Sequence, residues 1–417
     1  MRKWIQPDSR SFTILLGGLA VILVLFIIMY PDQVFKSSLN GLTLWWNVVF
    51  PGLLPFLILS EMMTGLGLVH ALGSLLESAM RWVFRLPGAG GWALALGLTA
   101  GFPAGADATG KLIRGRLINA AEAQRLLAVS HLCSPMVMIA VIGVGFLQSA
   151  ETGFLIAVIH YLSALIMGIT LRLLYKDGQA NKAPEDRSRS LQNQLGLLRR
   201  SAWSMRSAHQ EDGRTFGKLL GDSVTSAAQT LLAIGGYIIL FSVIHRVLVL
   251  AFGPFLAAEP ITTYLAGLLD PYLGVFGTSQ WSSSPLVQSA VIGAILGWSG
   301  FSLHAQTISL AKADGIRYFP FMFARLLHAA YAFILTVLLW KPLTSTFGII
   351  GTSFAPSDMV GASISAKSST IGAGSFWMEG LRMWPLLGKL YLFIALLIVL
   401  LICTSSIIYY ICRNKTN

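Results

Sequence analysis

Long runs without charged residues divide this sequence, and their lengths predict helices that cross a membrane. A helix needs about 20 consecutive apolar residues to span a hydrocarbon core of about 30 Å. The first run extends from Ser11 to Tyr30 and follows three basic residues, Arg2, Lys3 and Arg10. It is longer than the apolar region of a secretory signal peptide, and no small-x-small cleavage pattern follows it. We expect a retained first span with the N-terminus in the cytoplasm.

Further apolar segments predict the other spans. The earliest contains Pro51 and Pro55, which we expect to interrupt its helix. Two shorter segments, at residues 66–85 and 261–276, have the spacing of amphipathic helices. The expected spans cover residues 41–64, 124–148, 152–174, 217–252, 318–340 and 390–411.

Two apolar segments are too short to cross a membrane and end at a break. Residues 91–105 run into the polar stretch Asp107–Lys111. Residues 285–300 are followed by a break that we expect at Phe301–His304. A short apolar helix that meets a glycine or proline break and then polar residues is typical of a re-entrant hairpin or a broken transmembrane helix. We expect one such element in each half of the chain.

The two halves share landmarks in the same order, which indicates an internal repeat. Each half has a long span, an amphipathic helix, a short broken segment, basic residues, and then Arg-Leu-Leu at the start of a span. The matching residues are Gly101-Phe102 with Gly300-Phe301, Lys111 and Arg116 with Lys312 and Arg317, and Arg125 with Arg325. Counting crossings from a cytoplasmic N-terminus makes segment 41–64 begin outside and segment 217–252 begin inside. The repeats are therefore predicted to be inverted, as in many secondary transporters.

These segments define the expected fold class and organisation. The fold is predicted to be all-α: a polytopic helical membrane protein with two inverted repeats, each holding a broken or re-entrant helix. The basic residues of the long hydrophilic stretch at 176–214 favour a cytoplasmic loop. The same count places the C-terminus outside, although Arg413 and Lys415 follow the last span; a further crossing within residues 342–380 is the alternative. The expected parts are an N-terminal span and connector (1–40), the first repeat (41–175), the loop (176–214), the second repeat (215–341), and a Gly/Ser-rich loop with the C-terminal span (342–417).

Composition supports the membrane interpretation. Of 417 residues, 55% are hydrophobic and only 12% are charged, and the mean hydropathy is +0.69. Soluble domains carry about 25% charged residues, which excludes a cytosolic enzyme, a secreted domain and a disordered chain. The net charge of +12 is attributed to cytoplasmic loops and not to nucleic-acid binding. The sequence has no nucleophile elbow, P-loop, dinucleotide fingerprint or metal-spaced His/Cys set, so we expect neither an enzyme nor a cofactor.

Polar and ionisable residues within the apolar segments are the candidate binding residues, because such groups are costly in a membrane unless they are paired. Arg125 and Arg325 have planar forks suited to carboxylates, although snorkelling to the interface is the alternative for both. Asn47 and Glu61 share a helix face, and Asp107 follows the first break, where it is either a ligand or a helix cap. The other candidates are Gly101, Phe102, Pro103, Gly105, His131, Ser134, Phe301, His304 and Gln306.

Several of these motifs together resemble one family. Residues 47–56 read Asn-Val-Val-Phe-Pro-Gly-Leu-Leu-Pro-Phe, residues 101–105 read Gly-Phe-Pro-Ala-Gly, and Ser134-Pro135 and residues 143–146 follow. Over most of residues 40–340 the chain resembles the sporulation integral membrane protein YlbJ family, also called SpoVV. That family belongs to a wider group with paired nucleoside-recognition or Gate domains. The resemblance implies export of dipicolinate from the mother cell across the outer forespore membrane.

Dipicolinate is a flat aromatic dicarboxylate, which fits the candidate chemistry. Two arginines or two helix N-termini could each take one carboxylate, and Phe102 and Phe301 could stack on the ring. The expected partners are this small anionic solute and the lipid bilayer, without nucleic acid; a homo-oligomer is left open. Two other functions remain as alternatives: a non-transporting membrane scaffold for spore formation, and a nucleoside carrier.

Overall fold

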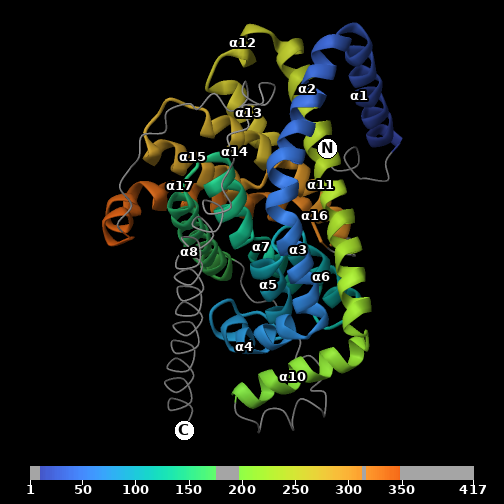
Figure 1. Ribbon diagram of the computed structural model, residues 1–417, viewed down its shortest axis with the longest axis vertical. Helices are drawn as coiled ribbons and strands as arrows, with labels where there is room; N and C mark the ends of the chain where they lie inside the picture. Colours follow the sequence, from blue (N-terminus) through green and yellow to red (C-terminus); the bar gives the residue numbers. More distant parts are fainter. Residues whose placement is uncertain (1–9, 175–196, 312–315, 348–417) are drawn as a thin grey trace, which may run out of the picture.

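The computed structural model describes residues 10–174, 197–311 and 316–347, and every regular element in these ranges is a helix (Figure 1). Five helical segments are long and apolar enough to cross a membrane: Pro31–Gly65, Ala150–Leu174, Phe216–Phe252, Pro285–Leu310 and Tyr318–Ser345. The prediction of an all-α polytopic membrane protein is therefore confirmed. Outside the described residues lie Lys312, the expected span at 390–411, the charged C-terminus, and most of the expected loops.

The N-terminal helices differ from the expectation in where they begin and break. α1 (Arg10–Met29) matches the expected first span, but the next helix begins at Pro31 and not at residue 41. It continues through α2 (Pro31–Leu44), η1 (Trp45–Val49) and α3 (Phe50–Gly65). The expected interruption at Pro51 and Pro55 is wrong, because the helix widens into the π-helical η1 just before Pro51 and then continues. Proline lacks an N–H and crowds the carbonyl four residues earlier, and the wider turn accommodates both effects.

The helix α2–η1–α3 packs along α11 (Phe216–Phe252), and the two run antiparallel (Figure 1). Near one end, Ser37 shares hydrogen bonds with Ser242. Halfway along, the Trp45 indole donates to the carbonyl of Leu231 at 2.9 Å, and its ring lies against Gly235, where a Cβ would clash. These two helices begin the two expected repeats, and opposite orientation is what inverted repeats require.

The first half continues through short helices, and one expected span is wrong. α4 (Leu68–Trp82) and α8 (Ala150–Leu174) confirm the expected helices at 66–85 and 152–174. α5 (Gly90–Thr99) and α6 (Ala104–Arg114) confirm the break in the first short segment. The expected span at 124–148 is instead α7 (Ala120–Ser130) and η2 (Val137–Phe146), separated by a non-helical stretch at His131–Ser134. An Asn119–Glu122 capping box starts α7.

The second half also contains two interruptions. After α12 (Pro254–Ala257), the expected helix at 261–276 is wrong: it is α13 (Ile261–Leu269) and α14 (Pro271–Ser279), separated at Asp270. The break in the second short segment lies at Ser299, between α15 (Pro285–Trp298) and α16 (Gly300–Leu310), and not at the expected residues 301–304. α17 (Tyr318–Phe347) contains the expected span at 318–340 and extends beyond it.

Part of the expected hydrophilic loop is helical. α10 (Leu197–Asp212) crosses the end of the molecule beneath α4 and leads into α11 (Figure 1). Arg200 forms an ion pair with Glu77 of α4, and the Ser201 hydroxyl donates to the carbonyl of Ala71 at 3.0 Å. The charges of this segment predict that it is exposed to water. Its packing against α4 depends on the tertiary structure and was not predicted.

Candidate functional site: four helix breaks that meet

The two interruptions of the first half lie against each other. Gly101 has φ +77°, a conformation that glycine adopts without the penalty other residues incur. A Cβ on Gly101 would lie 2.7 Å from the backbone nitrogen of Ser134, in the break between α7 and η2. Gly105 similarly lies against the carbonyl of Ser130, and the hydroxyls of Thr109 and Ser130 both donate to the carbonyl of Gly105, at 2.8 and 3.3 Å. Pro103 precedes the first residue of α6. The motif Gly-Phe-Pro-Ala-Gly therefore brings two helix breaks into direct contact.

The two interruptions of the second half form an equivalent contact. Gly300 has φ +72°, and a Cβ there would lie 2.9 Å from the Cα of Asp270. The Asp270 carboxylate is buried and accepts from the backbone N–H groups of Tyr272 and Leu273, which caps α14. It also accepts the Ser302 hydroxyl at 2.6 Å. Asp270 was missed at the sequence level, although an Asp-Pro pair between apolar runs is a helix-start signal.

The two pairs of breaks meet at the centre of the molecule. His131 links them, because its Nε2 lies 3.1 Å from the Ser299 hydroxyl and its Nδ1 lies 3.2 Å from the Thr307 hydroxyl. The Phe102 ring lies 4.5 Å from the His131 ring. Next to them is a small apolar cavity to which all four helix interruptions or their neighbours contribute. Its lining is Phe102, Cys133, Val137, Ile142, Pro271, Tyr272, Val275 and Leu296.

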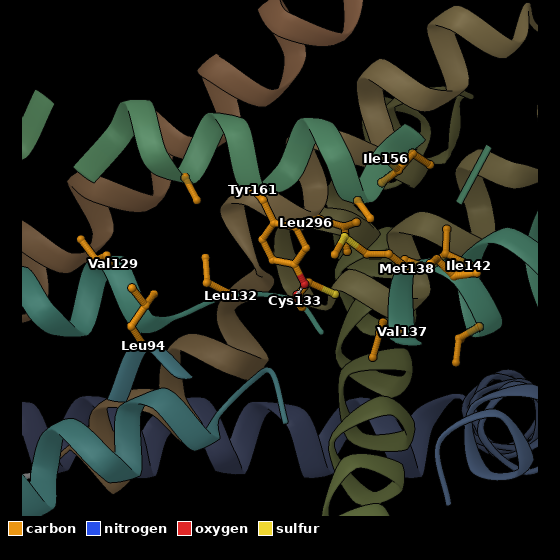
Figure 2. Close-up of a cluster of buried hydrophobic side chains, with 14 of the residues drawn as sticks. Leu94, Val129, Leu132, Cys133, Val137, Met138, Ile142, Ile156, Tyr161 and Leu296 are labelled. Atoms are coloured by element: carbon orange, nitrogen blue, oxygen red, sulfur yellow. Dashed lines mark hydrogen bonds between the residues drawn. The ribbon is translucent and has the colours of Figure 1, made fainter. Parts of the chain in front are cut away.

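Two side chains of α8 bind the backbone of Cys133, which lies in the break between α7 and η2. Its carbonyl accepts the Tyr161 hydroxyl at 2.9 Å, and its backbone N–H donates to Nε2 of His160 at 3.1 Å. Figure 2 shows Tyr161 pointing from α8 toward Cys133, among apolar side chains that include Leu132, Met138 and Leu296. A break inside a membrane protein needs such partners, because the backbone groups it frees have no water to bind.

Arg325 is the buried cation of this centre. Its side chain is 0% exposed and reaches from α17 to the end of α7, where it donates to the carbonyls of Ala128 at 2.7 Å and His131 at 2.8 Å. It also lies over the Phe321 ring, 5.8 Å from the centroid. Within the described ranges, no carboxylate lies within ion-pair distance of Arg325. Helix C-terminal carbonyls compensate only part of a full charge, so the centre retains a positive potential.

His304 borders the same cation. Its Nε2 donates to the carbonyl of Trp298 at 2.8 Å, and its Nδ1 lies 3.0 Å from the Tyr318 hydroxyl. The Phe321 ring stands between His131 and His304, with centroid distances of 5.2 and 5.1 Å. Aromatic and imidazole rings therefore surround the guanidinium on the side of α16 and α17.

The structure brings together about half of the candidate residues named from the sequence. Those at or beside the meeting breaks are Gly101, Phe102, Pro103, Gly105, His131, Ser134, His304 and Arg325. Gln306 is buried on α16, whereas Phe301 is 36% exposed and packs on Trp298.

The remaining candidates lie elsewhere. Asn47 is exposed on η1, and Glu61 is exposed on α3, where its carboxylate accepts from Ser226 at 3.2 Å. Asp107 is ion-paired with Lys111, one turn later on α6, at 2.7 Å. Arg125 donates to the carbonyl of Arg85 at 3.0 Å, beyond the end of α4. Arg125 and Arg325 therefore do not lie in one common site, as their matching sequence positions had suggested.

Interrupted helices that enclose a buried cation, in an all-α chain with several apolar spans, define the class: a polytopic integral membrane protein. Over 349 residues the sequence is 38% identical to the sporulation integral membrane protein YlbJ of Bacillus subtilis (strain 168). The aligned region covers 80% of this chain and 84% of that protein. The chain belongs to the YlbJ family of sporulation membrane proteins. No family model matches the sequence. No solved structure matches it either.

Proposed function

We propose that this protein carries a small anionic solute across a membrane, and that the solute is dipicolinate. The observation that carries the proposal is Arg325: a fully buried guanidinium that contacts backbone carbonyls and no described carboxylate. A buried charge without a counter-ion costs several kcal/mol, and an ionisable group at membrane depth is a functional candidate for that reason. An anion that binds beside Arg325 would remove this cost.

The donor geometry supports a carboxylate as the bound group. A guanidinium has five N–H donors, and two hydrogen bonds from Arg325 to backbone carbonyls account for only part of them. Its Nε is buried and has no hydrogen-bond partner among the described residues. Nε together with one terminal nitrogen forms the fork that binds a carboxylate in a bidentate manner.

The four breaks supply a means of movement. One break in each half, at Gly101 and at Ser299, lies at a matching position of the expected repeats. Broken helices at matching positions in inverted repeats are a usual basis of alternating access. The cavity beside Phe102 has room for about one water molecule, which is far less than an aromatic dicarboxylate needs. The proposed cycle therefore requires the paired breaks to separate, with Gly101 and Gly300 among the residues that change conformation. Phe102, whose ring lies beside that of His131, is the proposed contact for the aromatic ring of the solute.

Dipicolinate in particular rests on the family. The YlbJ relative is named as a sporulation integral membrane protein, and the motifs quoted above resemble a family associated with dipicolinate export. On this basis the protein would act in the outer forespore membrane and export dipicolinate from the mother cell. Both carboxylates of the solute would require positive partners, of which Arg325 is the first.

Counterflow in lipid vesicles tests the proposal. Purified protein is reconstituted, vesicles are loaded with unlabelled dipicolinate, and uptake of labelled dipicolinate is followed. We expect saturable uptake by the wild type, and Arg325→Lys should raise the apparent KM about tenfold or more, because lysine keeps the charge but loses the fork. Arg172→Lys is the matched control, since Arg172 also donates to two carbonyls, those of Trp82 and Val83, at a distance from the breaks.

Three outcomes decide the matter. Wild-type protein that shows no counterflow of dipicolinate contradicts the proposed solute. Unchanged kinetics in Arg325→Lys contradict the role of the guanidinium. In sporulating cells, a deletion strain should form spores with a low dipicolinate content, and expression of this chain should restore it.

A further inference from the structure

Two buried histidines beside Arg325 form a pair that the proposed anion site does not use. His160 on α8 and His328 on α17 are both 0% exposed, and their ring centroids lie 4.6 Å apart. His328 follows Arg325 by three residues, so the two side chains occupy adjacent turns of α17. The pair therefore belongs to the immediate surroundings of the buried cation.

Backbone partners determine which nitrogen of each ring carries the hydrogen. The N–H of Cys133 donates to Nε2 of His160 at 3.1 Å, so this nitrogen holds a lone pair and the neutral ring carries its hydrogen on Nδ1. Nε2 of His328 lies 3.1 Å from the carbonyl oxygen of His160, which can only accept, so this nitrogen carries the hydrogen. Nδ1 of neutral His328 is consequently a lone pair.

Both remaining nitrogens are buried without a hydrogen bond. Nδ1 of His160 and Nδ1 of His328 have no partner among the described residues. Buried polar atoms without partners are rare in folded proteins and require an explanation. Here one is a free donor and the other a free acceptor, on two rings in contact. This arrangement leaves a single vacant basic nitrogen in the pair, Nδ1 of His328.

The charged and titratable neighbours leave a further proton uncompensated. The ionisable groups around His328 are His160, whose ring is in contact with it, Arg325 three residues earlier on α17, and His131, whose carbonyl binds Arg325. The packed helices α15 and η2 contain no titratable side chain. The other titratable groups near the breaks are the Cys133 thiol, the Tyr161 hydroxyl bound to Cys133, His304 beside His131, and the Tyr331 hydroxyl bound to Thr170. Farther along α7, α8 and α17 are Glu122, Arg125, Glu151, Arg172, Tyr318 and Lys341. The Glu122 carboxylate accepts the Asn119 N–H at the start of α7, and the Glu151 carboxylate accepts the Ser149 hydroxyl at the start of α8. Within the described ranges, neither carboxylate forms an ion pair with Arg325 or His328.

A proton on Nδ1 of His328 would break no hydrogen bond, whereas a proton on Nε2 of His160 would displace the Cys133 N–H. Protonated His328 would, however, place a second positive charge one helical turn from Arg325. Like charges at this separation in a low-dielectric interior disfavour each other strongly. An anion beside Arg325 would offset this repulsion and favour protonation of His328. Anion and proton should therefore bind cooperatively, and the coupling is reciprocal by thermodynamic necessity.

We propose that His328, with its tautomer set by His160, is a proton-binding site that couples proton movement to anion transport. The inference rests on the proposed function and extends it to the coupling ion. The charges balance: a dicarboxylate with two negative charges is neutralised by Arg325 and one protonated histidine. The loaded centre would then cross its conformational cycle without net charge.

Proton uptake on binding is the direct test. Dipicolinate is added to purified wild-type protein in weakly buffered solution that contains a pH indicator. We expect uptake of about one proton for each dicarboxylate bound, at a pH above the ordinary pKa range of histidine. His328→Gln should abolish this uptake, because the Gln amide keeps a donor toward the His160 carbonyl but offers no basic nitrogen. The wild-type stoichiometry requires no variant and stands even where a variant fails to fold.

Vesicle transport separates the two proposals. An inwardly directed proton gradient should drive accumulation of dipicolinate by the wild type, and His328→Gln should lose this gradient-driven accumulation. His245→Gln is the matched control, since Nε2 of His245 also lies against a backbone carbonyl, that of Thr262, at 2.9 Å on the distant helix α11. Its coupling should equal that of the wild type.

The outcomes are distinct. Wild-type protein without counterflow contradicts the proposed function. Counterflow without proton uptake or gradient-driven accumulation overturns the coupling inference and leaves the proposed function in place. A His328→Gln variant that takes up protons and accumulates dipicolinate like the wild type overturns the assignment to His328.

Discussion

Arg125 and Arg325 open the same Arg-Leu-Leu motif in the two halves of the chain, yet the structure places them in different surroundings. Arg125 lies on α7 and donates to the carbonyl of Arg85, in the connection that follows α4. Arg325 lies where the four helix breaks meet and donates to the open end of α7 itself. The comparison teaches that an internal sequence repeat can predict where a residue lies along its helix, but not which groups its side chain contacts.

The difference has a physical origin in the helix that each arginine meets. An arginine at the start of a helix can reach the C-terminal carbonyls of a neighbouring helix, which attract cations. For Arg125 that neighbour ends near polar and exposed residues, since Arg85 itself is exposed. For Arg325 the neighbour ends inside the molecule, because α7 stops at Ser130 rather than continuing as one span. The break in α7 therefore gives Arg325 its central position.

The largest expected effect comes from neutralising the two arginines separately. Arg325→Gln should lower the rate of dipicolinate counterflow about 100-fold or more, which corresponds to the loss of a charge-assisted contact of about 3 kcal/mol. Arg125→Gln should stay within about threefold of the wild type. Counterflow in vesicles with equal amounts of inserted protein measures both. Equal losses in the two variants would contradict the central role of Arg325.

The contact between breaks predicts the next effect. Gly101→Leu should abolish transport and lower the midpoint of thermal unfolding, because φ +77° disfavours a side chain and Ser134 leaves no room for one. The conformational cost alone is about 1–2 kcal/mol. Gly236→Leu on α11 is the matched control, since a Cβ there would meet nothing within 4 Å. Tryptophan fluorescence during heating measures stability, and a tolerated Gly101→Leu would show that the breaks do not need close contact.

A smaller effect is expected from the two aspartates that follow apolar segments. Asp270→Ala removes the cap of α14 and the acceptor for Ser302 and should cost about 1–2 kcal/mol of stability. Asp107→Ala removes an exposed ion pair with Lys111 and should cost less than about 1 kcal/mol. Asp270→Asn, which keeps an acceptor for the two N–H groups, should recover part of the loss. Thermal midpoints of the three variants check the order, and a larger loss in Asp107→Ala would invert it.

The smallest effect concerns an arginine with carboxylate partners, in contrast to Arg325. Arg214 bonds Asp212 at 2.7 Å near the start of α11, and this hydrogen bond lowers the pKa of Asp212 below its ordinary value of 3.8. The resulting stabilisation is present above that ordinary pKa and is lost as the pH falls through the lower folded value. Asp212→Asn should therefore reduce stability by less than about 1 kcal/mol near neutral pH. Thermal midpoints measured down to acidic pH should converge with those of the wild type; a difference that grows on acidification would contradict this account.

The long helices were predictable because their signal is local. Segments 152–174 and 217–252 match α8 and α11 closely, since an uncharged run of sufficient length has few other stable forms in a bilayer. The first break was predictable for the same reason, because Gly101 and Pro103 oppose a continuous helix. The candidate residues of that motif are accordingly the ones that the structure brings to the centre.

The breaks at His131–Ser134 and Asp270 were not predicted. The first interrupts an apolar run and depends on partners distant in sequence: His160, Tyr161 and Arg325 bind the backbone groups that the interruption frees. The second has a local signal, Asp-Pro, but the amphipathic pattern continues across it. In both places the choice between one helix and two depends on hydrogen-bond partners that no local pattern describes.

The sequence by itself determined the solvent, the class and the family. An apolar content of 55%, charges confined to a few segments, and motifs shared with YlbJ require no knowledge of contacts. Only the tertiary structure decided which arginine is central, which residues border it, and which nitrogen of His328 stays free. The reason is that helix formation in a membrane depends on local hydrogen bonds and hydrophobicity, whereas the cost of a buried charge or an open helix end depends on what packs against it.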